Sequence, residues 1–439
     1  MDPNIKHEII GLTQDLVEFQ TYHEGFEGFN DRSEVDDCLD YIAGYFDDTD
    51  LHIQRYGHEG QEFTGEAFQH YDHEIYENPK PSMVISTDET LEPKYLLHGH
   101  IDVIAPNADN YLVNNKGLSE GEFPTEEDPE EIQKQAHFEP HIEGDRMYGR
   151  GTSDMKLGVA SLMKLMKDLE NEDAPSTSLM VVSDEEQGGF RGAGYLFRDV
   201  GYDPEFTISA EPSSSEEGFM VVYKQKGNFQ LDVELEGESA HGSKPWEGEC
   251  ANRKLMEFLY DLEERFPESS EEDQWHTTLN IGYMEGGAES RTSIPEQAKA
   301  LLGIRFAEDY HPNQIMRDVA DILGSNIEGE TAEEIAAELS SKDELEYGFN
   351  INNNEPMQLN EKDDPFIQRL SAIAEEVTGK EHEPVRKNGA SDARFATLDG
   401  RSGITFGPRG SNDHGKNEYA DLTSIEPFYT TLRRFVTEE

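Results

Sequence analysis

Two histidines and five carboxylates stand where predicted β-strands end or where a glycine-flanked loop precedes a predicted helix. They are His100, Asp102, Asp154, Glu185, Glu186, Glu211 and His414. Imidazole nitrogen and carboxylate oxygen together suit Zn²⁺ or a similar divalent cation. Ligands of open α/β sheets collect where the strands end, so these side chains are expected to meet. The pattern therefore predicts a divalent-metal site.

Each of these residues taken alone has an ordinary explanation, and only the set is informative. His100 alone would be a hydrogen-bonded core histidine, and Glu185 with Glu186 would be surface charge in so acidic a chain. In a strand, however, His100 and Asp102 face the same side, and a carboxylate beside a histidine fixes the tautomer of a metal ligand. Two carboxylates after a buried strand are costly unless a positive group neutralises them.

The elements that must position this set alternate between helix and strand. Apolar spacing predicts helices over residues 5–19 and 159–169, and short apolar runs predict strands at 83–86, 95–97, 179–182 and 206–209. A polar, acid-rich insertion occupies residues 106–140. This alternation indicates an α/β sheet.

The pattern changes near residue 226, where Phe229, Leu231, Val233 and Leu235 alternate as in a half-buried strand. Helices predicted over 251–266 and 314–323, with a strand over 300–306, complete an α+β pattern, and the first pattern returns near residue 356. We therefore expect an α/β catalytic domain in two parts, residues 1–225 and 352–439, interrupted by an inserted α+β domain over residues 226–351.

The composition excludes several classes of protein. The 439 residues include 94 Asp and Glu against 36 Lys and Arg, for a formal charge of -58, which would repel nucleic-acid phosphates. There is neither an apolar run long enough to span a membrane nor a visible signal peptide, and two cysteines fit a reducing cytoplasm. The acids are spread along the chain, which favours a surface adapted to molar salt over an acidic interaction tail.

Five motifs in order give the sequence a specific resemblance. They are LHGHIDV at residues 97–103, GRGTSDMKLG at 149–158, SDEEQGG at 183–189, AEPS at 210–213 and HGKNEY at 414–419. This series resembles the metal-site signature of the dinuclear zinc family that includes acetylornithine deacetylase, succinyl-diaminopimelate desuccinylase, aminoacylase and carboxypeptidase G. The resemblance implies a zinc-peptidase-like catalytic domain with an inserted dimerisation, or lid, domain.

The resemblance also implies roles for the metal-site residues, with two Zn²⁺ per chain and Co²⁺ or Mn²⁺ as alternatives. Asp154 would bridge both metals, His100 and Glu211 would complete one site, and Glu186 and His414 would complete the other. Asp102 would orient His100, and Glu185 would be the general base that takes a proton from the bridging water. Two divalent cations against three ligand carboxylates leave about one positive charge, which suits hydroxide and an oxyanion.

Outside the metal site the resemblance implies substrate contacts. His241, in ESAHGSKP at residues 238–245, would reach across a dimer to the substrate carbonyl. Arg394, in GASDARF at 389–395, and Arg305 are the expected carboxylate binders. Thr292 occupies a position where relatives often have Asn, so contacts there are expected to differ.

The function implied is hydrolysis of an amide bond in a small N-acyl amino acid or a short peptide. A deacylase of the acetylornithine deacetylase or succinyl-diaminopimelate desuccinylase kind is favoured because of the GASDARF loop, and a dipeptidase or carboxypeptidase is the alternative. A non-catalytic binding homologue is a more remote reading, since it would be expected to lose ligands or the base. The enzyme is expected to be a cytoplasmic homodimer.

Overall fold

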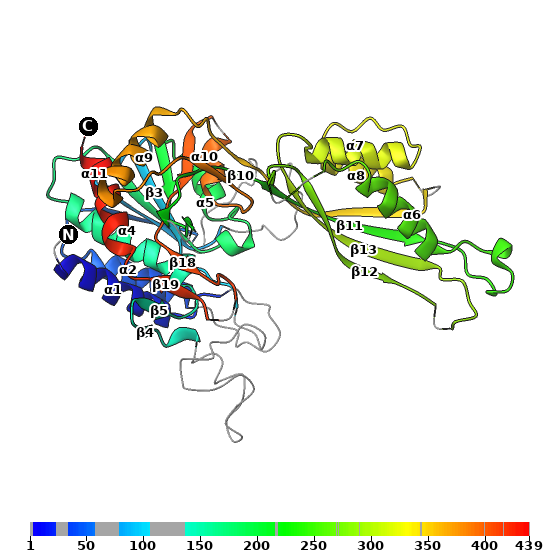
Figure 1. The fold of residues 1–439 in the computed structure, drawn as a ribbon, viewed down its shortest axis with the longest axis horizontal. Coiled ribbons are helices and arrows are strands. Elements are labelled where there is room, and N and C mark those ends of the chain that lie inside the picture. Colours follow the sequence, from blue (N-terminus) through cyan, green and yellow to red (C-terminus); the bar gives the residue numbers. More distant parts are fainter. Residues whose placement is uncertain are drawn as a thin grey trace, which may run out of the picture.

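The computed structural model describes residues 3–22, 34–57, 79–105 and 137–438, apart from residues 216, 217, 269, 271, 289, 343, 344, 399 and 416. Most of the acid-rich insertion expected over residues 106–140 thus lies outside the described residues. Figure 1 shows two lobes joined at one end of the smaller one. Among the described helices, none is both long and apolar enough to cross a membrane.

The larger lobe is built on a nine-stranded mixed sheet whose central strands are parallel. In sheet order the nine strands are β1 (His52–Tyr56), β2 (Ser82–Ser86), β6 (Thr177–Val182), β3 (Tyr95–His100), β7 (Phe206–Ser209), β17 (Ser402–Thr405), β10 (Val222–Gln225) and β15 (Gln358–Leu359), with β16 (Val385–Lys387) paired to β10. Strands β6, β3 and β7 are buried throughout, as expected for parallel strands covered on both faces.

The two faces of this sheet belong to different hydrophobic clusters because successive side chains of a strand point to opposite sides. In β3, Tyr95 and Leu97 join the main core, whereas Leu96 joins a smaller cluster on the other face. The main core is completed by helices α1 (Pro3–Glu18), α2 (Val35–Tyr45), α4 (Leu157–Leu169), α9 (Pro365–Thr378) and α11 (Ile425–Thr437). The smaller cluster draws on α5 (Ala193–Tyr195) and α10 (Ala393–Thr397).

The smaller lobe is an antiparallel sheet covered by helices, and we call it the lid. Its strand order is β12 (Thr278–Gly286), β13 (Gln297–Phe306), β11 (Gly227–Glu236) and β14 (Tyr347–Glu355), and its helices are α6 (Ala251–Glu263), α7 (Pro312–Ile322) and α8 (Ala332–Ser340). Inward residues of β11 alternate with outward ones, so the lid has a hydrophobic core of its own. Strand β14 runs to Glu355, four residues past the boundary of 351 expected from sequence.

A small sheet brings distant parts of the chain together beside the main one. Its order is β18 (Gly410–Ser411), β19 (Tyr419–Asp421), β5 (Arg146–Tyr148) and β4 (His141–Glu143). Because β5 pairs with β19, the loop that follows β5 lies beside the segment that carries His414. The α/β class with an inserted α+β domain is confirmed.

Candidate metal centre

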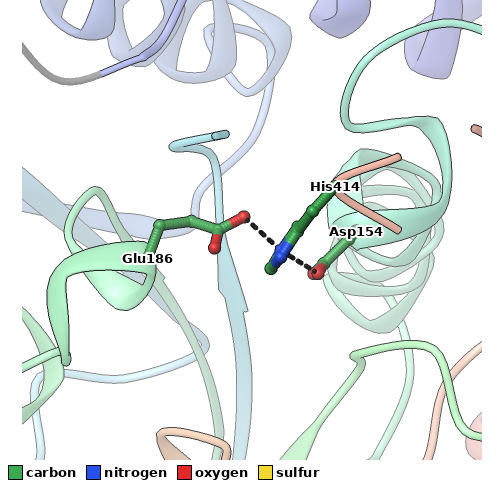
Figure 2. Close-up of side chains that lie close together, drawn as sticks. All are labelled: Asp154, Glu186 and His414. Atoms are coloured by element: carbon green, nitrogen blue, oxygen red, sulfur yellow. Dashed lines mark ion pairs between the residues drawn. The ribbon is translucent and has the colours of Figure 1, made fainter. Parts of the chain in front are cut away.

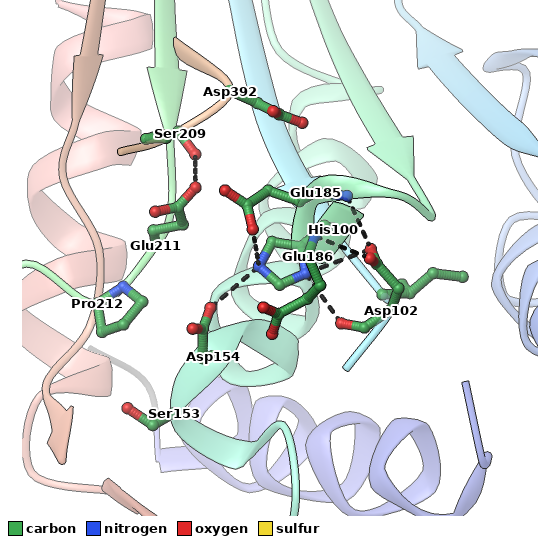
Figure 3. A network of polar contacts seen from close by, with 12 residues as sticks. His100, Asp102, Ser153, Asp154, Glu185, Glu186, Ser209, Glu211, Pro212 and Asp392 are labelled. Atoms are coloured by element: carbon green, nitrogen blue, oxygen red, sulfur yellow. Dashed lines mark hydrogen bonds and ion pairs between the residues drawn. The ribbon is translucent and has the colours of Figure 1, made fainter. Parts of the chain in front are cut away.

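The predicted metal ligands converge at the carboxyl end of the parallel strands (Figures 2 and 3). His100 ends β3, Glu185 and Glu186 follow β6, and Glu211 follows β7. Parallel strands have their carboxyl ends at the same sheet edge, so residues far apart in sequence meet there. Asp154 comes from the loop before α4, and His414 from the loop between β18 and β19.

The Asp154 carboxylate lies between the two histidines. Its Oδ1 is 3.0 Å from Nε2 of His100, and its Oδ2 is 3.2 Å from Nε2 of His414. His414 Nε2 is also 3.0 Å from Oε1 of Glu186, as Figure 2 shows. Asp154, Glu186 and His414 can each offer a ligand atom within 4.8 Å of the others, close enough to hold one cation.

The ring of His100 is oriented from its other nitrogen. Nδ1 donates to the backbone carbonyl of Asp102 at 3.0 Å, and Oδ1 of the same residue lies at 3.5 Å. This bond fixes a hydrogen on Nδ1 and leaves Nε2 facing Asp154, where its lone pair would be available to a bound cation. The Asp102 carboxylate accepts the backbone N–H groups of Glu185 and Glu186 at 3.3 and 3.0 Å. Besides the histidine, Asp102 therefore supports the turn that carries two carboxylates, a contact that the sequence did not reveal.

The electrostatics of the site favour added positive charge. Burial, followed by repulsion from Asp154, raises the pKa of Glu211 to about 8. Burial and then the charge of Glu211 raise the pKa of Glu185 well above its usual range, and burial also raises the pKa of Glu186. Hydrogen bonds with Asp154 and Glu186 raise the pKa of His414 to about 10. Divalent cations would relieve this crowding of carboxylates, so the donor set fits the metals that the sequence predicts.

Sequence reasoning missed Glu418, the fifth residue of the HGKNEY motif. Its carboxylate is buried, lies 2.6 Å from Nη1 of Arg150, and accepts the backbone N–H groups of Ser153 and Asp154 at 3.1 and 3.2 Å. These bonds fix the backbone that presents Asp154. Its place in the motif beside His414 was the only signal in the sequence.

Two of the predicted substrate contacts, His241 and Thr292, lie apart from the metal centre. His241 and Thr292 are exposed at the far end of the lid sheet, where His241 bridges to Ser293 and the N–H of Gly242 donates to the carbonyl of Thr292. His241 follows β11 and Thr292 precedes β13. Each of these strands has ten residues, is about 33 Å long, and leads away from the larger lobe (Figure 1). Within a single chain, the structure does not bring His241 to the metal centre.

The two candidate arginines have different surroundings. Arg305 is exposed on β13, near the end of the lid that adjoins the larger lobe. Arg394 is buried, donates to the carbonyl of Gly188 at 2.7 Å, and lies 3.4 Å from Glu355 and 3.6 Å from Asp392.

Comparisons with known proteins point to one family. The model of peptidase family M20/M25/M40 matches residues 96–438. A probable carboxypeptidase of Ajellomyces capsulatus is 32% identical over 253 residues, which cover 54% of this chain and 51% of the relative. A succinyl-diaminopimelate desuccinylase of Xanthomonas oryzae is 24% identical over 357 residues, covering 77% of this chain and 83% of the relative. The chain thus spans about half the length of the fungal relatives it matches.

Solved structures with the same fold include two peptidases. An M20 family metallo-carboxypeptidase from Sulfolobus solfataricus superposes with a TM-score of 0.67 at 15% identity, covering 98% of both chains. A tripeptidase from Staphylococcus aureus superposes with a TM-score of 0.65 at 16% identity, covering 98% of this chain and 97% of the other. At these identities the likeness concerns the fold.

Proposed function

Because this chain belongs to peptidase family M20/M25/M40, we propose that it is a dinuclear metal-dependent hydrolase that cleaves an amide bond next to a free carboxylate. The observation that carries the proposal is the Asp154 carboxylate, whose two oxygens face two different histidines at 3.0 and 3.2 Å. A carboxylate in this position can bridge two cations.

The residues that would hold the cations divide into two sets around Asp154. His100 and Glu211 would complete one set, and Glu186 and His414 the other. Nitrogen and oxygen donors suit Zn²⁺, with Co²⁺ and Mn²⁺ as alternatives. When bound, divalent cations lower the pKa of water and polarise a carbonyl oxygen.

Glu185 is the residue best suited to move the proton. It is not needed to complete either set, and its Oε2 lies 4.0 Å from Nε2 of His100. Burial raises its pKa well above the usual range, with the charge of Glu211 as the second cause, so its carboxylate is a stronger base than that of an exposed glutamate. It would accept a proton from water at Oε2 and pass it to the departing amine.

The substrate class follows from the family and from the basic residues near the centre. We favour an N-acyl amino acid over a peptide because of the GASDARF loop, as in deacylases of the desuccinylase kind. Arg305 is the better candidate for the substrate carboxylate, since Arg394 would first have to leave Glu355 and Asp392. Carboxypeptidase or dipeptidase activity is the second candidate, supported by the 32% identity to a probable carboxypeptidase.

A homodimer would give His241 and Thr292 a role. The edge strand β12 exposes Tyr283 and Met284, and the neighbouring helix α6 exposes Met256 and Tyr260. An edge strand with exposed apolar side chains is a template for pairing with a second copy. We propose that two lids pair there, so that each His241 serves the other chain. Light scattering at high KCl should give twice the mass of one chain.

The experiment that tests the function combines metal analysis with a hydrolysis screen. The chain is purified in high KCl, its Zn²⁺, Co²⁺ and Mn²⁺ contents are measured, and it is offered acetyl-ornithine, acetyl-lysine, succinyl-diaminopimelate and several dipeptides. Two metals per chain and turnover of one class support the proposal. A chain that binds no metal and hydrolyses none of these compounds would instead be a binding homologue.

Cys38 and Cys250 are free thiols, which supports a cytoplasmic location.

A further inference from the structure

Three polar side chains form a buried chain behind Glu211. Nδ1 of His98 lies 3.1 Å from Oγ of Ser209, and Nε2 lies 3.4 Å from Oδ2 of Asp392. The Ser209 hydroxyl is 3.4 Å from Oε1 of Glu211, the contact drawn in Figure 3. His98, Ser209 and Asp392 are at most 1% exposed, so this chain is shielded from solvent.

The direction of these contacts follows from the chemistry of the groups. With a cation bound, the Glu211 carboxylate would be ionised and could only accept hydrogen bonds, so the single hydroxyl hydrogen of Ser209 would be donated to Glu211. The Oγ of Ser209 must then accept from Nδ1–H of His98. This assigns one hydrogen to Nδ1 of the ring. For Nε2 to donate to Asp392 as well, it must also carry a hydrogen, so the contact with both partners needs the doubly protonated ring.

The backbone holds this chain rigidly. His98 and Ser209 are register partners on the parallel strands β3 and β7, and the N–H of Ala210 donates to the carbonyl of His98 at 3.0 Å. Asp392 precedes α10, and neither of its carboxylate oxygens has a hydrogen-bond partner within the described residues. A fully buried carboxylate is costly unless donors or cations face it. His98 on one side and Arg394, at 3.6 Å, on the other are the groups that face it.

We propose that Asp392, His98 and Ser209 are positioning residues that hold the Glu211 carboxylate in place for one metal. The inference rests on the proposed function and refines it, because it makes the two metal positions unequal. The position completed by His100 and Glu211 depends on the buried chain. At the other position, His414 contacts Asp154 and Glu186, so we infer that this position does not depend on the buried chain.

The test is a titration of metal-free protein with Co²⁺ in high KCl, followed by calorimetry and by the visible absorption of bound Co²⁺. The variants are Ser209→Ala and His98→Gln. Each variant is expected to keep wild-type Co²⁺ affinity at the position completed by Glu186 and His414. The Co²⁺ affinity of the position completed by His100 and Glu211 should fall by about 10- to 100-fold, the usual effect of losing a residue that orients a ligand. The absorption of the weakened position should change as well.

Two buried residues of the same lobe provide matched controls. Ser178 lies on β6 with its Oγ 2.9 Å from Oγ of Ser86, and His382 lies 2.6 Å from Oγ1 of Thr378. Ser178→Ala and His382→Gln remove similar buried hydrogen bonds away from the centre and should leave both affinities unchanged.

A double-mutant cycle shows whether Ser209 acts through Glu211. Once Glu211→Ala has been introduced, adding Ser209→Ala should change neither affinity further. Wild-type affinities at both positions in Ser209→Ala and His98→Gln would overturn the inference alone. A wild-type chain that binds no divalent ion would overturn the proposed function, and the inference with it.

Discussion

At the scale of single residues, the candidate site gains its character from burial. Glu185, Glu186 and Glu211 would be ordinary surface acids elsewhere in so acidic a chain. Here burial raises the pKa of all three, and the histidines are held against carboxylates. The same residue types therefore differ in chemistry according to how much water and how much opposite charge surround them.

Substitution of Glu185 should separate catalysis from metal binding. Glu185→Gln keeps the shape of the side chain but cannot accept the proton, so kcat should fall by about 10²- to 10⁴-fold with both metals retained. Turnover and metal content are measured on the same preparation. Glu186→Gln is the comparison, because loss of a ligand should lower the metal content. Near wild-type turnover by Glu185→Gln would rule out its role as the base.

The stability of the lid should respond to the protonation of His276. Its ring lies 2.8 Å from Asp309 and 3.0 Å from Asp273, and the two hydrogen bonds, Asp309 first, raise its pKa above the ordinary value of 6.5. The folded chain thus binds this proton more tightly than the unfolded chain. The resulting stabilisation is complete below about pH 6.5 and is lost as the pH rises through the raised pKa.

Tryptophan fluorescence can follow this effect, since both tryptophans, Trp246 and Trp275, belong to the lid. Urea midpoints of the wild type and of His276→Gln are compared at pH 5.5 and pH 9. The urea midpoint of the wild type should exceed that of the variant by more at pH 5.5 than at pH 9. A difference that is equal at both pH values would contradict the argument.

At the scale of elements, loops carry the ligands and the sheets fix the loops. The loop before α4 is fixed from a segment 264 residues away, because Glu418 accepts the N–H of Asp154. Gly151 in the same loop has a φ of 78°, and a Cβ there would lie 2.6 Å from Val103. Asp154 is therefore positioned by its backbone as well as by its partners.

Removal of Glu418 should release this loop. Glu418→Ala leaves the buried guanidinium of Arg150 without its carboxylate, which typically costs about 3–5 kcal/mol. Because Asp154 would serve both metals, both affinities should fall, in contrast to Ser209→Ala. Denaturant unfolding and Co²⁺ titration measure the two effects. Glu172→Ala removes the partner of Arg433 from a more exposed ion pair and should change little. Equal losses of stability and metal affinity in the two variants would contradict the prediction.

At the scale of the whole molecule, the chain belongs to the family expected from its five motifs. It carries a formal charge of -58. Only a handful of the acids lie at the candidate site. The remainder would repel one another in dilute salt, whereas a Debye length of about 3 Å in molar salt suppresses that repulsion.

The melting temperature should therefore rise between about 0.1 M KCl, where the Debye length is about 10 Å, and multimolar KCl. Far-UV circular dichroism measures the transition. Sucrose is the control, since it favours the compact state without screening charge. A melting temperature that does not change with KCl would remove the argument for a salt-adapted surface.

The sequence by itself determined the class of the fold, the positions of the helices and strands that it predicted within a few residues, and the set of candidate ligands. Local periodicity and ordered motifs carry that information, because they depend on neighbouring residues. It could not show that Asp102 supports Glu185 and Glu186, that Glu418 holds the loop of Asp154, or that His98 and Ser209 stand behind Glu211. It also did not show that Arg394 is buried between two carboxylates. Nearly all of these contacts join residues that are distant in the chain, so the packing of the strands and loops decided them.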